Sequence, residues 1–229
     1  VVCNSDAVRT HYFGSRDKHA KVVYNAAAPR KDFLAYKERI RLREHHEVYT
    51  FAVVGTLSPM KHQDLAIKAL AKVLEQGRRA RLLVAGDGDT EYTAYLVDLV
   101  HRCGLDAEVV FLGFVQDPYE VYLRADCLLV CSEHEAMGRV VVEAMAACLP
   151  VIGRASGGLP ELIQDKRTGL LFGDLEELVG CMLAVLADPE AGRHLGQNAW
   201  EDAIQKYTLE AHAQSIYGVL CKSIRVPPT

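Results

Sequence analysis

The stretch of residues 126–163 constrains the fold of this chain more than any other. It begins with a bounded apolar run, residues 127–132, of the kind that forms a strand buried in a parallel sheet. A short polar loop follows, and Gly138 then opens a run of good helix formers. A second apolar strand starts at Pro150, so the order is strand, loop, helix and strand. This is the order of a βαβ unit, and it predicts an open parallel sheet.

The loop and the helix start of this unit carry the residue types of an anion-binding site. In open parallel sheets, ligands bind beyond the carboxyl ends of the strands, where loops and helix N-termini collect. Two carboxylates, Glu135 in the loop and Glu143 on the helix, bracket the segment Met137, Gly138 and Arg139. These three residues are expected to present free amides, a positive helix end and one guanidinium. Such a group suits an anion such as a phosphate.

The length and charge of the chain narrow the possible classes. Its 229 residues can bury one sizeable core, and a net charge of −4 argues against a nucleic-acid-binding protein. No apolar run reaches the length of a membrane span, so we expect no transmembrane segment. The seven cysteines form no C-x-x-C pair, and this odd count without a signal peptide predicts a reducing cytoplasm. Because the chain begins with Val instead of Met, we expect it to be a fragment or a processed chain.

Strands and helices alternate along the rest of the chain. The apolar patterns predict further strands at residues 1–5, 21–24, 49–54, 81–85, 108–112 and 169–172. They predict helices at residues 6–13, 30–46, 61–76, 91–103, 118–124, 175–186, 190–207 and 210–224. This alternation predicts an α/β fold with a doubly wound parallel sheet.

Five motifs, taken in order, resemble one enzyme family. The pair Glu135 and Glu143 forms E-x7-E, which continues into E-A-M-A, P-V-I and G-G-L-P-E-L-I. This pattern resembles the Rossmann-like, donor-binding half of GT-B glycosyltransferases, and most closely the retaining enzymes of glycosyltransferase family four. The first-strand motif V-V-G with Lys61, and the strand ends L-V-A-G-D-G and V-F-L-G-F-V, resemble that family too. E-x7-E alone is a weak signal, whereas five motifs in the right order are a strong one.

The resemblance implies a division of the chain and a reaction. Residues 1–46 would be the end of an acceptor-side domain and the interdomain linker, residues 47–207 the nucleotide-sugar-binding domain, and residues 208–229 a C-terminal helix and tail. The reaction would transfer a hexosyl unit from a UDP- or GDP-sugar to an unidentified acceptor, with no cofactor or metal required. An acceptor-binding domain would precede Val1, so this chain alone should bind the donor but transfer poorly. The whole protein would be cytoplasmic, either free or held at the inner membrane surface by the missing domain.

The resemblance also implies a role for each site residue. Glu143 would bind the ribose hydroxyls, and Glu135 would face the sugar near its reacting carbon. Lys61 would pair with the diphosphate, so Glu135 and Lys61 are the expected catalytic residues. The expected donor-binding residues are Gly55, Thr56, Lys61, Phe114, Val115, Met137, Gly138, Arg139 and Glu143.

Three positions depart from the family pattern. Thr56 stands where the family usually has Arg, and His62 stands where it usually has Gly after the lysine. Cys148 stands where the family has Gly at the end of the central helix, a position that favours the left-handed conformation. Loss of the arginine weakens the expected diphosphate site. Arg139, beside the same helix N-terminus, is the residue that can compensate.

Several other patterns lead to weaker hypotheses. Asp87-Gly88-Asp89 spells the D-x-D of metal-dependent sugar transferases with another fold, but its position in a βα loop favours a tight turn. The same loop starts like a dinucleotide fingerprint, yet Glu91 replaces the third glycine, so no nicotinamide cofactor is expected. His134 beside Glu135 either lines the pocket or lies in solvent.

Two alternatives stay open beside the transferase. One is a nucleotide-sugar epimerase or a phosphorylase on the same fold, although no lysine has the context of a pyridoxal phosphate site. The other belongs to a different class: a non-catalytic nucleotide-sugar-binding subunit that completes a site with a separate chain.

Overall fold

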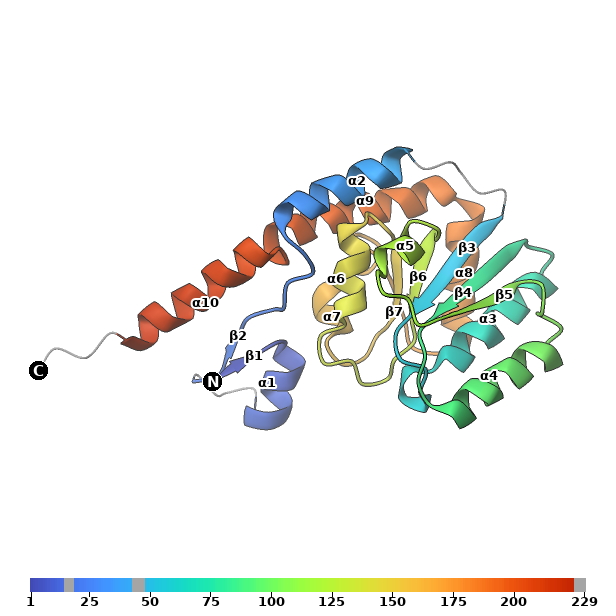
Figure 1. Ribbon diagram of the computed structural model, residues 1–229, viewed down its shortest axis with the longest axis horizontal. Helices are drawn as coiled ribbons and strands as arrows, with labels where there is room; N and C mark the ends of the chain where they lie inside the picture. The colour runs from blue at the N-terminus through green and yellow to red at the C-terminus, as the bar shows by residue number, and fades with distance from the viewer. Residues whose placement is uncertain (15–18, 43–47, 225–229) are drawn as a thin grey trace, which may run out of the picture.

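The computed structural model describes residues 1–14, 19–42 and 48–224 of an α/β protein (Figure 1). Its main feature is a six-stranded parallel sheet with the strand order β5-β4-β3-β6-β7-β8. The strands are β3 (Tyr49–Val54), β4 (Ala80–Ala85), β5 (Val109–Gly113), β6 (Cys127–Val130), β7 (Val151–Arg154) and β8 (Leu170–Phe172). The chain moves outward from β3 to one edge, then returns to β6 and moves to the other. The predicted doubly wound parallel sheet is therefore confirmed, with its switch point between β3 and β6.

Helices cover both faces of this sheet and bury it, which explains why its strands are nearly continuous apolar runs. One face packs against α5 (Tyr119–Tyr122), α6 (Arg139–Ala146) and α9 (Pro189–Lys206). The other face packs against α3 (Gln63–Glu75), α4 (Thr90–Arg102) and α8 (Leu175–Ala187). All four residues of β6 are buried, so the strand that leads into the E-x7-E motif is fixed at the centre of the core.

The first residues form a small unit of their own beside the main sheet (Figure 1). Strands β1 (Val2–Cys3) and β2 (Lys21–Val22) pair in parallel, and α1 (Asp6–Phe13) lies between them in sequence. Ser5 caps α1, since its hydroxyl accepts a hydrogen bond from the Val8 amide at 3.1 Å. This unit contacts the main body near α7 (Leu159–Leu162), a short helix that the sequence analysis did not predict.

Two long helices frame the molecule. Helix α2 (Arg30–Leu42) lies along α9, and the Trp200 indole on α9 donates to the Phe33 carbonyl at 3.1 Å. Helix α10 (Leu209–Ile224) extends away from the body toward the C-terminus (Figure 1). The predicted helix over residues 30–46 is observed as far as Leu42, and its last residues lie outside the described ranges.

The prediction of a helix starting at Lys61 is wrong. Pro59–Lys61 form a short 3-10 turn, η1, closed by the Lys61 amide donating to the Ser58 carbonyl at 2.9 Å. His62 then adopts the left-handed conformation with φ of 49°, and α3 begins only at Gln63. Because one residue in this conformation interrupts a helix, Lys61 lies on a turn outside α3.

Candidate functional site

A cavity of 340 Å³ lies at the carboxyl edge of the sheet, where the ends of β3, β4 and β5 meet the start of α6. Ligands of open parallel sheets bind at this edge beside the switch point. Six predicted donor-binding residues line the cavity: Gly55, Thr56, Phe114, Val115, Arg139 and Glu143. Phe114 is 71% exposed, so one wall is an open aromatic side chain that a planar ring can cover.

Bare backbone forms the floor of this cavity. Gly55 and Gly86 end β3 and β4 with φ values of 140° and 137°, a region that side chains with a Cβ rarely adopt. A Cβ on Gly86 would lie only 2.0 Å from the Gly55 carbonyl oxygen. The two strand ends can approach this closely only because Gly86 lacks a side chain. The amides of both glycines donate within the sheet, to the Ala85 carbonyl at 2.9 Å and the Gly113 carbonyl at 2.8 Å.

Glu143 is the buried charged group of the cavity, with only 6% of its surface exposed. The Tyr122 hydroxyl donates to its Oε2 at 3.0 Å, and the Arg139 guanidinium donates to its Oε1 at 3.0 Å. Burial raises the pKa of Glu143 above its usual value, while the hydrogen bonds from Tyr122 and Arg139 oppose that rise. Each carboxylate oxygen retains capacity for a second donor. The Glu143 carboxylate is thus oriented to accept hydrogen bonds from hydroxyl groups of a ligand.

The tyrosines behind Glu143 had no role in the sequence analysis. Tyr122 is fully buried, and burial raises the pKa of its hydroxyl well above the usual range, so it remains a hydrogen-bond donor. Tyr119 packs edge-on against Tyr122 at 5.6 Å and stacks on Tyr36 at 3.7 Å between ring centroids. The spacing of Tyr119 and Tyr122 on one short helix was the signal that could have found this support.

Lys61 and Glu135 meet beside the main cavity. The Lys61 Nζ lies 2.6 Å from the Glu135 Oε2, with side-chain exposures of 37% and 16%. Both residues line a pocket of 20 Å³ that adjoins the main cavity through Val54 and Val140. From the sequence, we expected Glu135 to face the sugar and Lys61 to face the diphosphate of one ligand. In the structure their side chains contact each other directly.

Met137 and Gly138, both predicted donor-binding residues, lie just before α6 and line neither the cavity nor the adjoining pocket. The Met137 side chain is 2% exposed, and its sulfur accepts from the Asn25 amide at 3.1 Å, so it faces the N-terminal segment. Gly138 caps α6 in the left-handed conformation with φ of 77°. The first amides of a helix have no carbonyl partner within it, so this helix start offers donors to an anion.

The turn 156–158 packs tightly against the Glu135 loop. The Gly158 amide donates to the Glu135 carbonyl at 2.7 Å. A Cβ on Gly157, whose φ is 59°, would lie 2.4 Å from the same carbonyl oxygen. The two glycines therefore allow the turn to support the loop at backbone distance.

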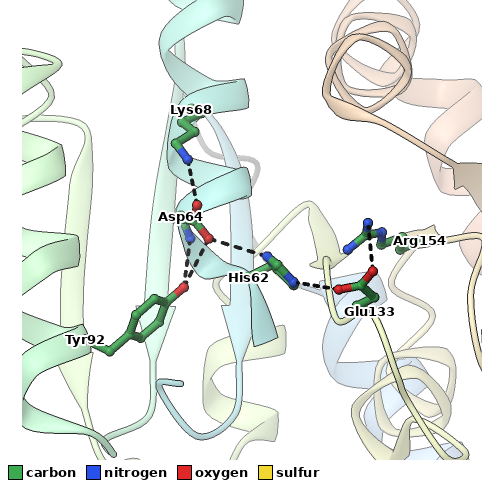
Figure 2. Close-up of polar contacts among 6 residues, drawn as sticks. All are labelled: His62, Asp64, Lys68, Tyr92, Glu133 and Arg154. Atoms are coloured by element: carbon green, nitrogen blue, oxygen red, sulfur yellow. Dashed lines mark hydrogen bonds and ion pairs between the residues drawn. The ribbon is translucent and has the colours of Figure 1, made fainter. Parts of the chain in front are cut away.

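A polar network also surrounds His62 (Figure 2). Its Nε2 lies 3.4 Å from the Glu133 Oε2, and its Nδ1 lies 3.8 Å from the Asp64 Oδ1. Glu133 in turn lies 3.8 Å from the Arg154 guanidinium at the end of β7. On the other side, Asp64 contacts the Lys68 amine at 2.7 Å and the Tyr92 hydroxyl at 3.2 Å. His62 therefore links the turn that carries Lys61 to the loop that carries Glu135.

The weaker sequence patterns have structural explanations. Asp89 caps α4, because its side chain accepts from the Tyr92 amide at 2.7 Å. The expected tight turn at Asp87-Gly88-Asp89 is wrong, since Gly88 forms a parallel bridge with Leu57, and the Leu57 amide donates to the Asp87 carbonyl at 2.9 Å. His134 is exposed. Cys148 has the expected left-handed conformation, with φ of 53°.

Two negative observations hold for residues 1–14, 19–42 and 48–224. Within these ranges no three His, Cys, Asp or Glu side chains come together as a set of metal ligands would. The helices of the same ranges include none that is long and apolar enough to cross a membrane.

Curated proteins similar to this chain include several that are named glycosyltransferases. The chain is 32% identical over 217 residues to an uncharacterized glycosyltransferase of Methanocaldococcus jannaschii, which covers 90% of this chain and 55% of that protein. It is 30% identical over 216 residues to the N-acetyl-alpha-D-glucosaminyl L-malate synthase of Bacillus anthracis, which covers 92% of this chain and 55% of that protein. The chain thus spans about half the length of these relatives.

The fold comparison agrees with the sequence comparison. The crystal structure of Anabaena HepE in complex with UDP-glucose aligns with a TM-score of 0.83 and 27% identity, over 97% of this chain and 63% of that one. The sequence model of the family described as glycosyl transferases group 1 matches residues 36–202. With the expected GT-B-type sheet in place as well, this chain belongs to the glycosyl transferases group 1 family.

Proposed function

We propose that this chain is the nucleotide-sugar-binding half of a retaining glycosyltransferase that transfers a hexosyl unit. The observation that carries this proposal is the adjacency of two carboxylates at one sheet edge. Glu143 lines the 340 Å³ cavity, and Glu135 lies in the adjoining pocket with Lys61. The HepE complex with UDP-glucose supports a donor of this class, with UDP the first candidate and GDP the second.

The donor would lie along the cavity from base to sugar. The base would cover Phe114 and Val115, and the ribose hydroxyls would donate to Glu143. The diphosphate would lie at the start of α6, where free amides and the Arg139 guanidinium favour an anion. Its second phosphate would meet Lys61, which places the sugar beside Glu135.

The proposed chemistry breaks the bond between the sugar's anomeric carbon and the phosphate oxygen. The bonding electrons stay on the phosphate, where Lys61, Arg139 and the α6 amides stabilise the growing charge. The acceptor hydroxyl attacks from the same face, and the departing phosphate takes its proton, so no side-chain base is needed. The Glu135 carboxylate stabilises the positive charge that develops on the sugar. Lys61 would then bridge Glu135 and the phosphate.

The acceptor side lies outside this chain in the proposal. An acceptor-binding domain would precede Val1 in the whole protein, which would act in the cytoplasm. Residues 1–46 would complete that domain and link it to the donor half. The proposed donor half is residues 47–207, and it includes every site residue named above.

A calorimetric titration of this chain tests the proposal. UDP, GDP and ADP are titrated separately, with uridine, guanosine and adenosine as controls for the contribution of the base and ribose. One diphosphate should bind better than the other two, and better than its own nucleoside. If none of the three diphosphates binds more tightly than its nucleoside, the assignment of a nucleotide-sugar donor is wrong.

A further inference from the structure

Glu161 connects the donor half to the N-terminal unit through its carboxylate. One oxygen accepts from the Asp6 amide at 2.7 Å, and the other accepts from the Ala7 amide at 2.7 Å. The Tyr24 hydroxyl adds a third hydrogen bond at 2.9 Å. Asp6 and Ala7 begin α1, so their amides have no carbonyl partner within that helix. The carboxylate therefore occupies the anion-binding start of α1 from a residue 154 positions away.

We propose that Glu161 is a positioning residue that transmits the docking of the N-terminal unit to the Glu135 loop. This inference rests on the proposed function, in which Glu135 meets the donor sugar. Glu161 does not line the cavity or the pocket of Lys61. Glu161 acts on the site through the turn 156–158, which precedes Glu161 in the chain.

The path from Glu161 to Glu135 is short and made mostly of backbone. Glu161 belongs to α7, and its own amide donates to the Gly158 carbonyl at 3.2 Å. The Gly158 amide donates in turn to the Glu135 carbonyl at 2.7 Å. Because a Cβ on Gly157 or Gly158 would lie 2.4 Å from a carbonyl oxygen of this loop, the two segments cannot shift independently. A displacement of Glu161 must therefore displace Glu135.

A second contact ties the N-terminal segment to the same loop. The Asn25 amide donates to the sulfur of the buried Met137, two residues after Glu135. Tyr24, its neighbour, bonds Glu161 through its hydroxyl, and burial raises the pKa of that hydroxyl to about 12, so it stays a donor. Adjacent residues of one segment thus reach both the Met137 end of the loop and the turn that supports it. This pairing is what distinguishes Glu161 from an ordinary helix cap.

The consequence for catalysis lies in where Glu135 is held. Its carboxylate is 2.6 Å from Lys61, so a small shift of the loop alters that ion pair and the distance to the sugar. An electrostatic group acts on a transition state only if it is placed in advance. Displacement by about 1 Å can lower a rate by about 10²-fold. The nucleotide end of the cavity, at Glu143, is supported by α6 and should stay in place.

Glu161→Ala, Glu161→Gln and Tyr24→Phe form a graded series for testing this inference. Glu210→Ala is the matched control, because Glu210 also caps a helix start, accepting from the Arg30 amide of α2 at 3.0 Å. Hydrogen exchange of the Gly158 amide measures the support of the loop. Glu161→Ala should accelerate the exchange of the Gly158 amide by about tenfold, as expected for local loosening. Of the three variants, Tyr24→Phe should accelerate this exchange least. Unchanged exchange in Glu161→Ala, or equal acceleration in Glu210→Ala, would overturn the inference.

Turnover in a protein that carries both halves of the fold provides the second readout. Glu161→Ala should lower kcat by about tenfold, and by less than Glu135→Gln, while the affinity for the nucleoside diphosphate stays unchanged. A helix cap with a purely structural role would lower the melting temperature without this split between kcat and affinity. If Glu135→Gln lowers turnover and Glu161→Ala does not, the inference is wrong and the proposed function stands. If Glu135→Gln leaves turnover unchanged, the proposed role of Glu135 fails, and the exchange of Gly158 alone decides whether the coupling exists.

Discussion

The two carboxylates of the E-x7-E motif lie in different physical settings. Glu143 lies inside α6, is 6% exposed, and is held by Tyr122 and Arg139. Glu135 lies in a loop and is held by Lys61, itself on a 3-10 turn. Side chains on packed helices are placed more accurately than side chains on loops. In the proposed function, the ribose end at Glu143 would fix the position of the donor, whereas the phosphate and sugar end at Lys61 and Glu135 would rearrange during the reaction.

The two settings also differ in solvent access. Burial of the Glu143 carboxylate raises its pKa, because the charged form loses its hydration. The hydrogen bonds from Tyr122 and Arg139 partly offset this cost. The pair of Lys61 and Glu135 is partly exposed, with the Lys61 side chain at 37%. Partly exposed ion pairs contribute little to stability, so this pair can exchange partners when a phosphate arrives. Substitution of Glu135 should therefore affect turnover, whereas substitution of Glu143 should affect binding of the nucleotide.

The largest expected effect concerns the sugar end. Glu135→Gln keeps the shape of the side chain but removes its charge near the reacting carbon. Turnover in a protein with both halves should fall by about 10²–10³-fold, the amount typical of one preorganised electrostatic group. The nucleoside diphosphate should bind as before, since it does not contact this side chain. Unchanged turnover would show that Glu135 has no role in the mechanism. An equal loss of diphosphate affinity would mean that the true donor site lies one loop away from the proposed one.

A smaller effect is expected at the ribose end. Glu143→Ala removes the acceptor of two hydroxyl groups, and hydrogen bonds to a charged group contribute about 1.5–3 kcal/mol. Calorimetry should show weaker binding of the nucleoside and of its diphosphate alike. Tyr122→Phe serves as the matched control, because it removes one support of Glu143 and leaves the carboxylate. Unchanged affinity in Glu143→Ala would contradict the ribose assignment.

The diphosphate between the two ends should respond to Lys61 and Arg139. Lys61→Ala and Arg139→Ala should each reduce diphosphate affinity by up to about tenfold, because both cations are partly exposed, and should leave nucleoside affinity nearly intact. If both residues contact one phosphate, the double variant should lose less than the sum of the two single losses. Strictly additive losses would show that Arg139 does not replace the arginine that the family usually has where this chain has Thr56.

The smallest expected effect is a pH dependence of nucleoside affinity, caused by the buried carboxylate of Glu143. The pKa of Glu143 is raised above its usual 4.5, and only the ionised form accepts both ribose hydroxyls. Affinity for the nucleoside, which carries no phosphate, should therefore fall as the pH falls through this raised value. The stability linkage has the opposite sign, because the contribution of Glu143 is complete below 4.5 and is lost as the pH rises through the folded pKa. Nucleoside titrations of Glu143→Gln should be flat over the same range, and an equal pH dependence there would assign it to another group.

Much of the fold could be predicted from the sequence because its signals are local. Buried runs such as β6 and the good helix formers of α6 are each decided within a few residues. The order of these elements then restricts the topology to a parallel sheet. The left-handed Cys148 was also expected, because it stands at a helix end where the family has Gly.

The parts that could not be predicted depend on contacts between distant segments. The direct pair of Lys61 and Glu135 joins residues 74 positions apart, and His62 joins two loops through Glu133. The start of α3 was misplaced because the glycine that the family usually has at the position of His62 was not taken as a sign of the left-handed conformation. The bond between Glu161 and α1 joins residues 155 positions apart and has no local signal. Six of the residues that line the cavity could be named from the sequence, but the pairing of Lys61 with Glu135 could not.

The central claim is that the donor binds in the cavity between the strand ends and α6. A second hollow of 830 Å³ lies next to it, on the α4 side of Gly86 and Asp87, and is lined by Thr93 and Val97. Amide chemical-shift mapping with UDP distinguishes the two directly. If the donor binds in the 340 Å³ cavity, we expect the largest shifts at Gly55, Val115 and Arg139, and small ones at Thr93 and Val97. The largest shifts at Thr93 and Val97, with little change at Gly55 and Arg139, would contradict the claim.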